Sequence, residues 1–337
     1  MRVAIVGAGA MGTLLGHGLC KSGHDVSVLD LPHRVAHLRL TGNLVVVGEN
    51  GVESAARPSL ITADYSEAGP AHDIVILATK SQDLPAVARS VAGLVHDGAT
   101  IVTIQNGIPW WYLQKLPGDY GGSRIQCLDP DGLLEQCIEP SQIVGCVAYP
   151  AAMMEADGRV RHVEGWRFPV GEIDGPARER THMIAGLFED AGFKSRVIDD
   201  IRSEIWLKAW GALSINPISA LTRATMEDIC TFTDTRELVA QMMREAQQVA
   251  EAYGATFRHT IEKRIDGARA VGPHKTSMLQ DVESGLPLEL DALMLAVIEL
   301  AELAGKETPT IRSIYACVAL LNEGLLSVQM QAGTRAP

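Results

Sequence analysis

The chain begins with a short apolar run that leads directly into a glycine-rich loop. Residues 3–6 read Val-Ala-Ile-Val, and Gly7, Gly9 and Gly12 then form the pattern GxGxxG ahead of a helix-length segment at 11–21. A strand before this loop and a helix after it are the context that gives the pattern meaning. Gly7 permits a tight turn, Gly9 lets the backbone approach a pyrophosphate, and Gly12 allows close helix–strand packing. The feature predicts a dinucleotide-binding unit in preference to a glycine turn without a ligand.

An acidic residue follows the second apolar run of the chain. That run covers 26–29, and Asp30 stands eighteen residues after Gly12. A carboxylate at this place accepts hydrogen bonds from an adenosine ribose and repels a 2′-phosphate, so Asp30 favours NAD(H) over NADP(H). Asp is also a good N-cap and Pro32 suits a first helical turn, so a second interpretation makes Asp30 a helix cap only.

Short apolar runs alternate with helical segments over roughly the first 200 residues. The runs lie at 3–6, 26–29, 74–77, 100–104 and 142–147. Buried parallel strands have this texture, so the pattern predicts a doubly wound α/β domain of Rossmann type over 1–199. Two antiparallel strands around the turn Asp157-Gly158 are expected at 149–152 and 165–168. Apolar residues then follow helical spacing, which predicts an all-α domain over 200–330 and a tail at 331–337.

Composition excludes several classes of protein. The 337 residues include 29 Lys and Arg against 41 Asp and Glu, a formal net charge of −12. Nucleic-acid binding needs a basic surface, so no nucleic-acid partner is expected. No apolar run of membrane length and no signal-peptide pattern is evident, which predicts a cytoplasmic protein without a membrane span. The six cysteines lack metal-finger spacing, so they are expected to be reduced thiols and no metal site is predicted.

Further blocks carry a resemblance to a known family. They are Ala78-Thr79-Lys80, Gln105-Asn106-Gly107, Trp206-Leu207-Lys208, Asn216-Pro217, Ser277-Met278-Leu279-Gln280-Asp281 and Glu289-Leu290-Asp291. With the glycine loop, their order and spacing closely resemble the ketopantoate reductases (2-dehydropantoate 2-reductases), from residue 1 to about 325. The Ser-Met-Leu-Gln-Asp block, with Glu289 twelve residues after its Ser, is the most specific of them.

The resemblance implies a fold, a reaction and a set of site residues. It implies a Rossmann domain followed by a helical domain like the C-terminal domain of 6-phosphogluconate dehydrogenase. The implied reaction passes a hydride from NADPH to a small 2-keto acid, as from ketopantoate to pantoate, and a homodimer is a possible assembly. Lys208 and Glu289 match the catalytic positions. The whole set of predicted binding residues is Gly7, Ala8, Gly9, Ala10, Met11, Gly12, Asp30, Lys80 and Asn106 for the cofactor, and Asn216, Ser277 and His274 for the substrate.

The chemistry of a ketone reduction explains why a lysine would be used. Hydride arriving at the carbonyl carbon leaves negative charge on the oxygen, and a nearby ammonium polarises that oxygen and then protonates it. Lys208 stands in a largely apolar segment, where its stem would otherwise simply pack while the ammonium reaches water. We also expect Lys80, Lys208 and Lys275 to supply the positive charge that a dinucleotide and a carboxylate require.

Several site residues have plainer structural explanations. Asn216 can end a helix before Pro217, Glu289 can stabilise the first turn of a helix, and Ser277 can be an N-cap. The chain also departs from the family, since Ala212 stands where members often carry a second Asn, and His274 stands where an Asn can serve the substrate. Two alternatives therefore remain: a related hydroxy acid dehydrogenase with another substrate, and an NAD(P)-binding redox sensor without catalysis.

Overall fold

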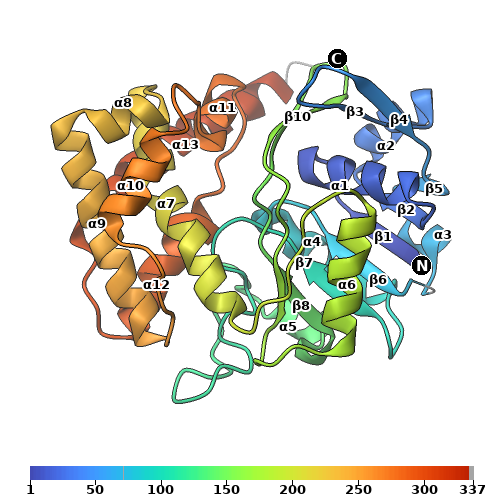
Figure 1. Cartoon of the computed structure of the whole chain (residues 1–337), viewed down its shortest axis with the longest axis horizontal. Coiled ribbons are helices and arrows are strands. Elements are labelled where there is room, and N and C mark those ends of the chain that lie inside the picture. The colour runs from blue at the N-terminus through green and yellow to red at the C-terminus, as the bar shows by residue number, and fades with distance from the viewer. Residues whose placement is uncertain (71, 334–337) are drawn as a thin grey trace. The chain divides into compact units, whose positions relative to one another are not determined.

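The computed structural model describes residues 1–70 and 72–333, which form two compact units (Figure 1). The first unit comprises 1–124 and 129–201, and the second begins at 202. The second unit also includes the short segment 125–128, which no sequence pattern marks. The chain therefore passes between the units three times.

A seven-stranded sheet is the centre of the first unit. Its order is β11-β8-β7-β6-β1-β2-β5, and only β11 is antiparallel to its neighbour. The strands are β1 (Arg2–Val6), β2 (Asp25–Leu29), β5 (Leu60–Thr62), β6 (Ile74–Leu77), β7 (Thr100–Thr103), β8 (Ile143–Cys146) and β11 (Val170–Glu172). The five predicted runs are thus confirmed as parallel strands. Strand order reverses on the two sides of β1, which places a ligand-binding crevice outside its carboxyl end.

A second, four-stranded sheet has the order β4-β3-β10-β9. Its strands are β3 (Leu44–Val47), β4 (Glu53–Ala56), β9 (Ala151–Met154) and β10 (Val160–Glu164). The antiparallel pair around Asp157-Gly158 is present, but its second strand is β10, so the prediction of a strand at 165–168 is wrong. Gly158 has φ +82°, which lets the turn close directly before β10.

Helix α1 (Ala10–Lys21) packs between the two sheets. It contacts β1 and β2 on one side and all four strands of the second sheet on the other. The remaining helical segments of this unit are α2 (Pro32–Thr41), α3 (Tyr65–Ala68), η1 (Ser81–Asp83), α4 (Leu84–Ala92), α5 (Leu133–Cys137), η2 (Pro140–Gln142) and α6 (Glu179–Asp190). Because α1 is covered on both sides, the loop at its amino end is fixed by the core of the domain.

The aromatic cluster after β7 is part of the core. Trp110, Trp111 and Tyr112 are at most 3% exposed. Trp111 Nε1 donates a hydrogen bond to Thr103 Oγ1 at 3.0 Å. These rings pack the long connection between β7 and β8 onto the sheet, and they do not offer an open surface to a substrate.

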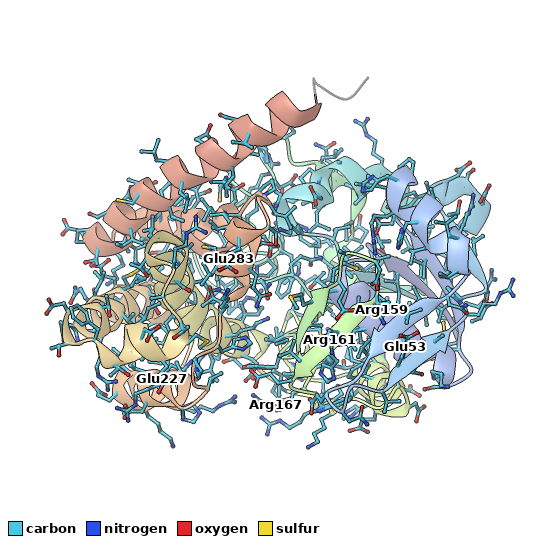
Figure 2. All side chains as sticks on the ribbon, turned by 90° about the horizontal axis from the view of Figure 1, so that it is seen from above. Glu53, Arg159, Arg161, Arg167, Glu227 and Glu283 are labelled. Atoms are coloured by element: carbon cyan, nitrogen blue, oxygen red, sulfur yellow. The ribbon has the colours of Figure 1, made fainter. Side chains whose placement is uncertain are left out.

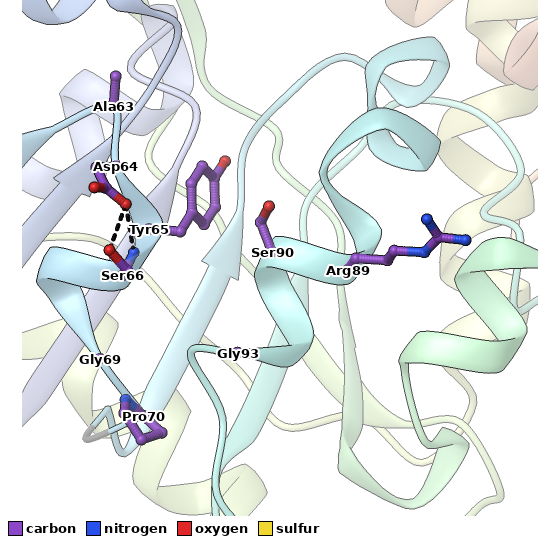
Figure 3. A pocket seen from close by; sticks show the side chains of 9 residues that line it. All are labelled: Ala63, Asp64, Tyr65, Ser66, Gly69, Pro70, Arg89, Ser90 and Gly93. Carbon is purple, nitrogen blue, oxygen red and sulfur yellow. Dashed lines mark hydrogen bonds between the residues drawn. The ribbon is translucent and has the colours of Figure 1, made fainter.

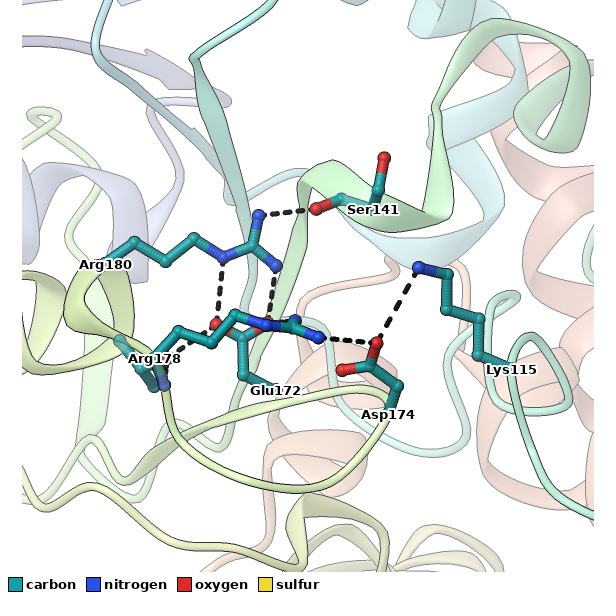
Figure 4. A network of polar contacts seen from close by, with 7 residues as sticks. Lys115, Ser141, Glu172, Asp174, Arg178 and Arg180 are labelled. Carbon is teal, nitrogen blue, oxygen red and sulfur yellow. Dashed lines mark hydrogen bonds and ion pairs between the residues drawn. The ribbon is translucent and has the colours of Figure 1, made fainter.

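The buried carboxylate of Glu172 joins several segments at one edge of the seven-stranded sheet (Figure 4). Glu172, in β11, is 1% exposed. Arg180 donates to both of its oxygens, Arg178 Nη1 donates to Oε2 at 2.7 Å, and Thr181 Oγ1 donates to Oε1 at 2.6 Å. Arg178 also pairs with Asp174, which lies 3.7 Å from Lys115 Nζ. The network therefore joins β11, the start of α6 and the connection between β7 and β8.

The second unit is helical, as predicted. Its helices are α7 (Ile201–Thr222), α8 (Met226–Thr231), α9 (Thr233–Ala252), α10 (Ile261–Arg269), α11 (Ser277–Glu283), a π-helical turn η3 (Asp291–Leu295), α12 (Ala296–Leu303) and α13 (Pro309–Gly333). Trp210 Nε1 donates to the carbonyl of Met243, and the Tyr253 hydroxyl donates to the carbonyl of Leu300. These bonds lock α9 between α7 and α12. The predicted tail overlaps α13 as far as Gly333, and residues 334–337 lie outside the described part of the chain.

Two carboxylates of the helical unit hold backbone segments in place. Glu299 accepts hydrogen bonds from the N–H groups of Gln126 and Cys127, at 2.5 and 2.9 Å. These contacts explain why 125–128 joins this unit. Glu245 accepts the N–H groups of Thr310 and Ile311 at the start of α13, where a helix has backbone donors to satisfy.

Helix α13 is exposed along much of its length. Leu320 and Val328 are 75% and 67% exposed. Residues 309–328 have a mean hydropathy of 1.3, and 11% of that window is buried. Within the described residues this is the one helix that could cross a membrane by length and composition. A single helix of this kind is weak evidence for a membrane span.

Candidate active site

The glycine loop makes the tight turn that its pattern predicts. Gly7 has φ +99°, and a Cβ built on it would lie 2.6 Å from the backbone nitrogen of Thr79. A Cβ on Gly12 would lie 1.9 Å from the carbonyl oxygen of Gly7. Neither position has room for a side chain. The loop therefore packs directly between the end of β6 and the first turn of α1.

The outer side of the same loop is open. Gly9 is the exposed N-cap of α1, and the space around its Cβ position is empty to 4 Å. No side chain caps the helix, so the first-turn N–H groups of Ala10 and Met11 are available to an anion. The positive end of the helix dipole adds to this attraction. Ala8, between the glycines, is buried and fixed through its own backbone.

The ends of β6 and β7 meet beside the loop. Gln105 Nε2 donates to the carbonyls of Leu77 and Thr79, at 2.8 and 3.2 Å. This bridge joins the segment that carries Lys80 to the segment that carries Asn106, both of which are half-buried. Thr79 Oγ1 and Gln105 Oε1 are buried without a hydrogen-bond partner among the described residues. Buried polar atoms of this kind are ready to contact a ligand, so the crevice fits a dinucleotide.

Asp30 is joined to the glycine loop and does not cap α2. The N-cap of α2 is Leu31, whose side chain makes no capping bond, so the interpretation of Asp30 as a cap is wrong. Asp30 Oδ2 accepts the N–H of Ala8 at 2.5 Å, and Oδ1 accepts the N–H of Leu31 at 2.6 Å. Arg34 Nη2 donates to the carbonyl of Ala8 at 2.9 Å. The Asp30 carboxylate therefore stands directly beside the glycine turn.

Two further groups near Asp30 were not identified from the sequence. Burial and the charge of Asp30 raise the pKa of Tyr65 to about 12. Burial also raises the pKa of Asp83, with Asp30 adding to the effect and Lys80 opposing it. Tyr65, Ser90 and Arg89 are among the residues that line a hollow of about 860 Å³. Figure 3 shows Tyr65 on α3, and Ser90 and Arg89 on α4. Tyr65 follows β5 and Asp83 follows β6, at the carboxyl edge of the sheet. This position after a strand is the sequence feature that could have identified them.

In the second unit, helix α7 carries a single partly exposed stripe. From Glu204 to Ala220 every residue is buried except Lys208, Ala212 and Asn216. These three residues follow one another at intervals of four, which places them on one side of the helix. Lys208 and Asn216, eight residues apart, are separated by about 80° around the helix axis. The α7 helix continues through Pro217, so the prediction that Asn216 ends the helix is wrong. A lysine and an amide thus share one face of an otherwise buried helix.

The other predicted residues of this unit lie at the starts of helices. Thr276 is the N-cap of α11, so Ser277 is not a cap and is an exposed first-turn residue. His274, two residues before Thr276, is half-buried. Glu289 is half-buried and precedes both the N-cap Leu290 and the π-helical turn, so it does not lie in the first turn as predicted.

Lys275 is engaged by a neighbouring carboxylate. Its Nζ lies 2.8 Å from Oε1 of Glu283, which is labelled in Figure 2. The expectation that Lys275 supplies free positive charge for a ligand is therefore weakened, because the ion pair already balances it. Lys80 and Lys208 remain the candidate cations.

Comparison with known families decides what kind of protein this is. Residues 3–175 match the family model described as ketopantoate reductase PanE/ApbA. Residues 200–322 match the model described as its C-terminal part. The chain belongs to the ketopantoate reductase family. The Rossmann-type domain and the helical domain that the resemblance implied are confirmed with it.

Individual relatives agree with the family over nearly the whole chain. A 2-dehydropantoate 2-reductase from Mesorhizobium japonicum is 45% identical over 95% of this chain and 98% of its own. A crystal structure of a putative ketopantoate reductase from Ralstonia solanacearum has 34% identity and a TM-score of 0.90, covering 96% of this chain and 98% of that one. A ketopantoate reductase from Staphylococcus aureus, described as dimeric, shares the fold at 21% identity and a TM-score of 0.71, over 96% and 100% of the two chains.

These matches confirm the predicted activity. The protein is an oxidoreductase of the ketopantoate reductase type, which acts on a small keto acid.

Proposed function

We propose that this ketopantoate reductase protonates its product through Lys208. The observation that carries the proposal is the stripe on α7, where Lys208 is the one cation on a face that otherwise holds Ala212 and Asn216. A lysine whose stem packs in a buried helix has restricted rotamers, so its ammonium is presented in one direction. A purely structural lysine would gain nothing from an amide two turns further on.

The proposed reaction is a hydride transfer followed by protonation. When bound, the nicotinamide cofactor supplies the hydride. The Lys208 ammonium donates a hydrogen bond to the keto oxygen of the substrate, which polarises the carbonyl, and it transfers a proton to that oxygen as negative charge develops. General acid catalysis of this kind contributes roughly 10²–10⁴-fold to the rate.

The remaining residues hold the substrate in place. Glu289 accepts a hydrogen bond from the substrate hydroxyl and orients the Lys208 ammonium. Asn216, Ser277 and His274 offer hydrogen-bond donors for the substrate carboxylate and carbonyl groups. The Ser277 hydroxyl is exposed, which supports this role because it is open to a substrate.

The cofactor groups belong to the Rossmann unit. The first-turn N–H groups of α1, around Gly9, bind the pyrophosphate, and Lys80 and Asn106 contact the cofactor from the ends of β6 and β7. Family resemblance alone favours NADPH. The position of Asp30, locked to Ala8 by a 2.5 Å hydrogen bond, favours NADH, because a 2′-phosphate would meet a fixed negative charge. We propose NADH as the preferred cofactor.

Replacing Asp30 with Ala tests the cofactor preference. We expect Asp30→Ala to reduce the NADH-over-NADPH ratio of kcat/KM by about tenfold or more, since both a ribose acceptor and a repulsive charge are lost. Steady-state kinetics with both cofactors measure it. Asp25→Ala, at the opposite end of β2, removes the same charge and should leave the ratio unchanged. An unchanged ratio in Asp30→Ala would make Asp30 a purely structural residue.

The structure also bears on the alternative substrate. Ala212 occupies the centre of the α7 stripe and has no donor, so the site has one amide fewer than many family members. This favours a second 2-keto acid as an additional substrate, which a panel of keto acids tests directly.

A homodimer stays a prediction of the sequence, supported by the description of the Staphylococcus aureus relative.

A further inference from the structure

Helix α10 turns one charged residue toward its buried side. Ile265 and Ala268 are the buried residues of this helix, and Arg264 lies four positions before Ala268, on the same side. Arg264 is half-buried, whereas the other charged residues of α10 are exposed, namely Glu262, Lys263, Asp266 and Arg269. Because a charge on the apolar side of an amphipathic helix costs free energy, Arg264 calls for a function.

The guanidinium of Arg264 lies against Gly211 of α7. A Cβ built on Gly211 would lie 2.9 Å from Cζ of Arg264 and 3.1 Å from Nε, with Nη2 closer still. No side chain could stand at this position without displacing the guanidinium. The glycine therefore lets a charged group of α10 approach the backbone of α7, within the same compact unit.

Gly211 adjoins the α7 stripe of Lys208, Ala212 and Asn216. It follows Lys208 by three residues, which is about 60° around the helix axis. Residues three apart on a helix are neighbours, with Cβ atoms roughly 5–6 Å from each other. The Arg264 guanidinium therefore lies on the flank of the stripe that carries the proposed catalytic lysine.

A 2-keto acid brings two groups that need different partners. Its keto oxygen needs the proton donor that we assign to Lys208. Its carboxylate, on the adjacent carbon, needs donors and a counter-charge, and Ala212 supplies neither. Lys275 is already paired with Glu283. A guanidinium meets the need, because its planar fork binds a carboxylate through two parallel N–H···O bonds.

We propose that Arg264 binds the carboxylate of the keto acid and thereby selects substrates that carry this charge, in place of the second Asn that Ala212 replaces. This inference rests on the proposed role of Lys208 and names the group that holds the substrate beside it. The two cations divide the substrate between them: Arg264 holds the carboxylate, and Lys208 acts on the keto oxygen. Gly211 is part of the arrangement, because it leaves room for the guanidinium.

Kinetics with a charged and an uncharged substrate test the proposal. Ketopantoate carries the carboxylate, and its lactone keeps the keto group without the charge. We expect Arg264→Met, which keeps an apolar stem, to raise KM for ketopantoate by roughly 10- to 100-fold and to leave kcat/KM for the lactone within about threefold of wild type. Arg264→Lys keeps the charge without the paired geometry, so it should recover part of the loss. If the substrate panel identifies a better 2-keto acid, that acid and its methyl ester replace the two compounds.

A second variant displaces the guanidinium without removing it. Ala is a better helix former than Gly, so α7 is expected to persist in Gly211→Ala. The new methyl group should push the Arg264 guanidinium aside and raise KM for ketopantoate severalfold. In the Arg264→Met background the same substitution should change KM little, because the group that it displaces is gone. Arg269→Met is the matched control, since it removes an exposed arginine of the same helix that pairs with Asp266, and it should match wild type.

The outcomes separate this inference from the mechanism proposed for Lys208. A loss confined to ketopantoate in Arg264→Met supports the inference, even if the Lys208 variants are fully active and that mechanism fails. Equal losses with both compounds, or no loss with either, would overturn it and leave the mechanism intact. If Arg264→Met does not fold, the same comparison in Gly211→Ala decides. If wild type does not reduce the lactone, partial recovery in Arg264→Lys supports the inference, and its absence overturns it.

Discussion

Replacing Lys208 with Ala is expected to lower kcat by about 10²–10⁴-fold while leaving the dissociation constant of the cofactor within about twofold of wild type. The ammonium is proposed to act only where charge develops on the substrate oxygen, so its loss should appear in the chemical step. Cofactor binding rests on the Rossmann unit and should not change. Single-turnover kinetics measure the chemical step, and fluorescence titration measures cofactor binding.

A matched variant controls for loss of a lysine from a helix of the same unit. Lys263 is exposed on α10, and Lys263→Ala should retain wild-type kcat. Lys208→Met keeps the apolar stem while removing the charge, so it should be as slow as Lys208→Ala. If hydride transfer in both Lys208 variants stays within twofold of wild type, Lys208 serves packing only and the mechanism is wrong.

Replacing Glu172 with Gln is expected to reduce the free energy of unfolding by roughly 3 kcal/mol. The carboxylate is fully buried and receives hydrogen bonds from Arg178, Arg180 and Thr181. Its loss removes the counter-charge of Arg180 and leaves Arg178 paired with Asp174 alone. Both arginines keep some contact with water, which places the effect at the lower end for a broken buried pair. Chemical denaturation measures the change, and Glu179→Gln, exposed in the first turn of α6, should stay within about 0.5 kcal/mol.

The same carboxylate gives the stability difference a defined pH dependence. Burial raises the pKa of Glu172, but the hydrogen bonds and charges of Arg180, Thr181 and Arg178 outweigh it and hold the pKa below its ordinary value of 4.5. A depressed pKa stabilises the fold above the ordinary value, and the contribution is lost as pH falls through the folded-state pKa. The gap between wild type and Glu172→Gln should therefore be full at pH 7 and narrow below about pH 4. A gap that persists undiminished at pH 3 would rule out this origin.

Much of the fold was predictable because its centre is apolar and periodic. The runs that became β1, β2, β6, β7 and β8 are buried on both faces, so each is a short segment rich in Val and Ile. The second sheet was missed apart from its hairpin. Glu53–Ala56, for example, is four residues long and partly exposed, so it carries no apolar block. Their position is set by packing on α1, a contact distant in sequence.

The candidate site was predictable where spacing alone identifies a residue. The glycine loop falls into this class, and its tight turn is confirmed by Gly7 and Gly12. Lys208 and Glu289 were identified through the resemblance to the family, and their catalytic roles stay predictions. Tyr65 could not be found this way, because its place near Asp30 depends on β2 and β5 ending side by side. The local roles of Asp30, Ser277 and Asn216 were also misjudged, since Leu31 and Thr276 take the cap positions and α7 continues past Pro217.

The most direct test of the whole account is an initial-rate measurement on ketopantoate with NADH and NADPH side by side, using the purified wild-type chain. We expect ketopantoate to be reduced in each of two separate assays, one with NADH and one with NADPH. The value of kcat/KM should be higher with NADH. Higher efficiency with NADPH would contradict the role proposed for Asp30. Absence of ketopantoate reduction with either cofactor, together with turnover of another 2-keto acid, would contradict the central assignment.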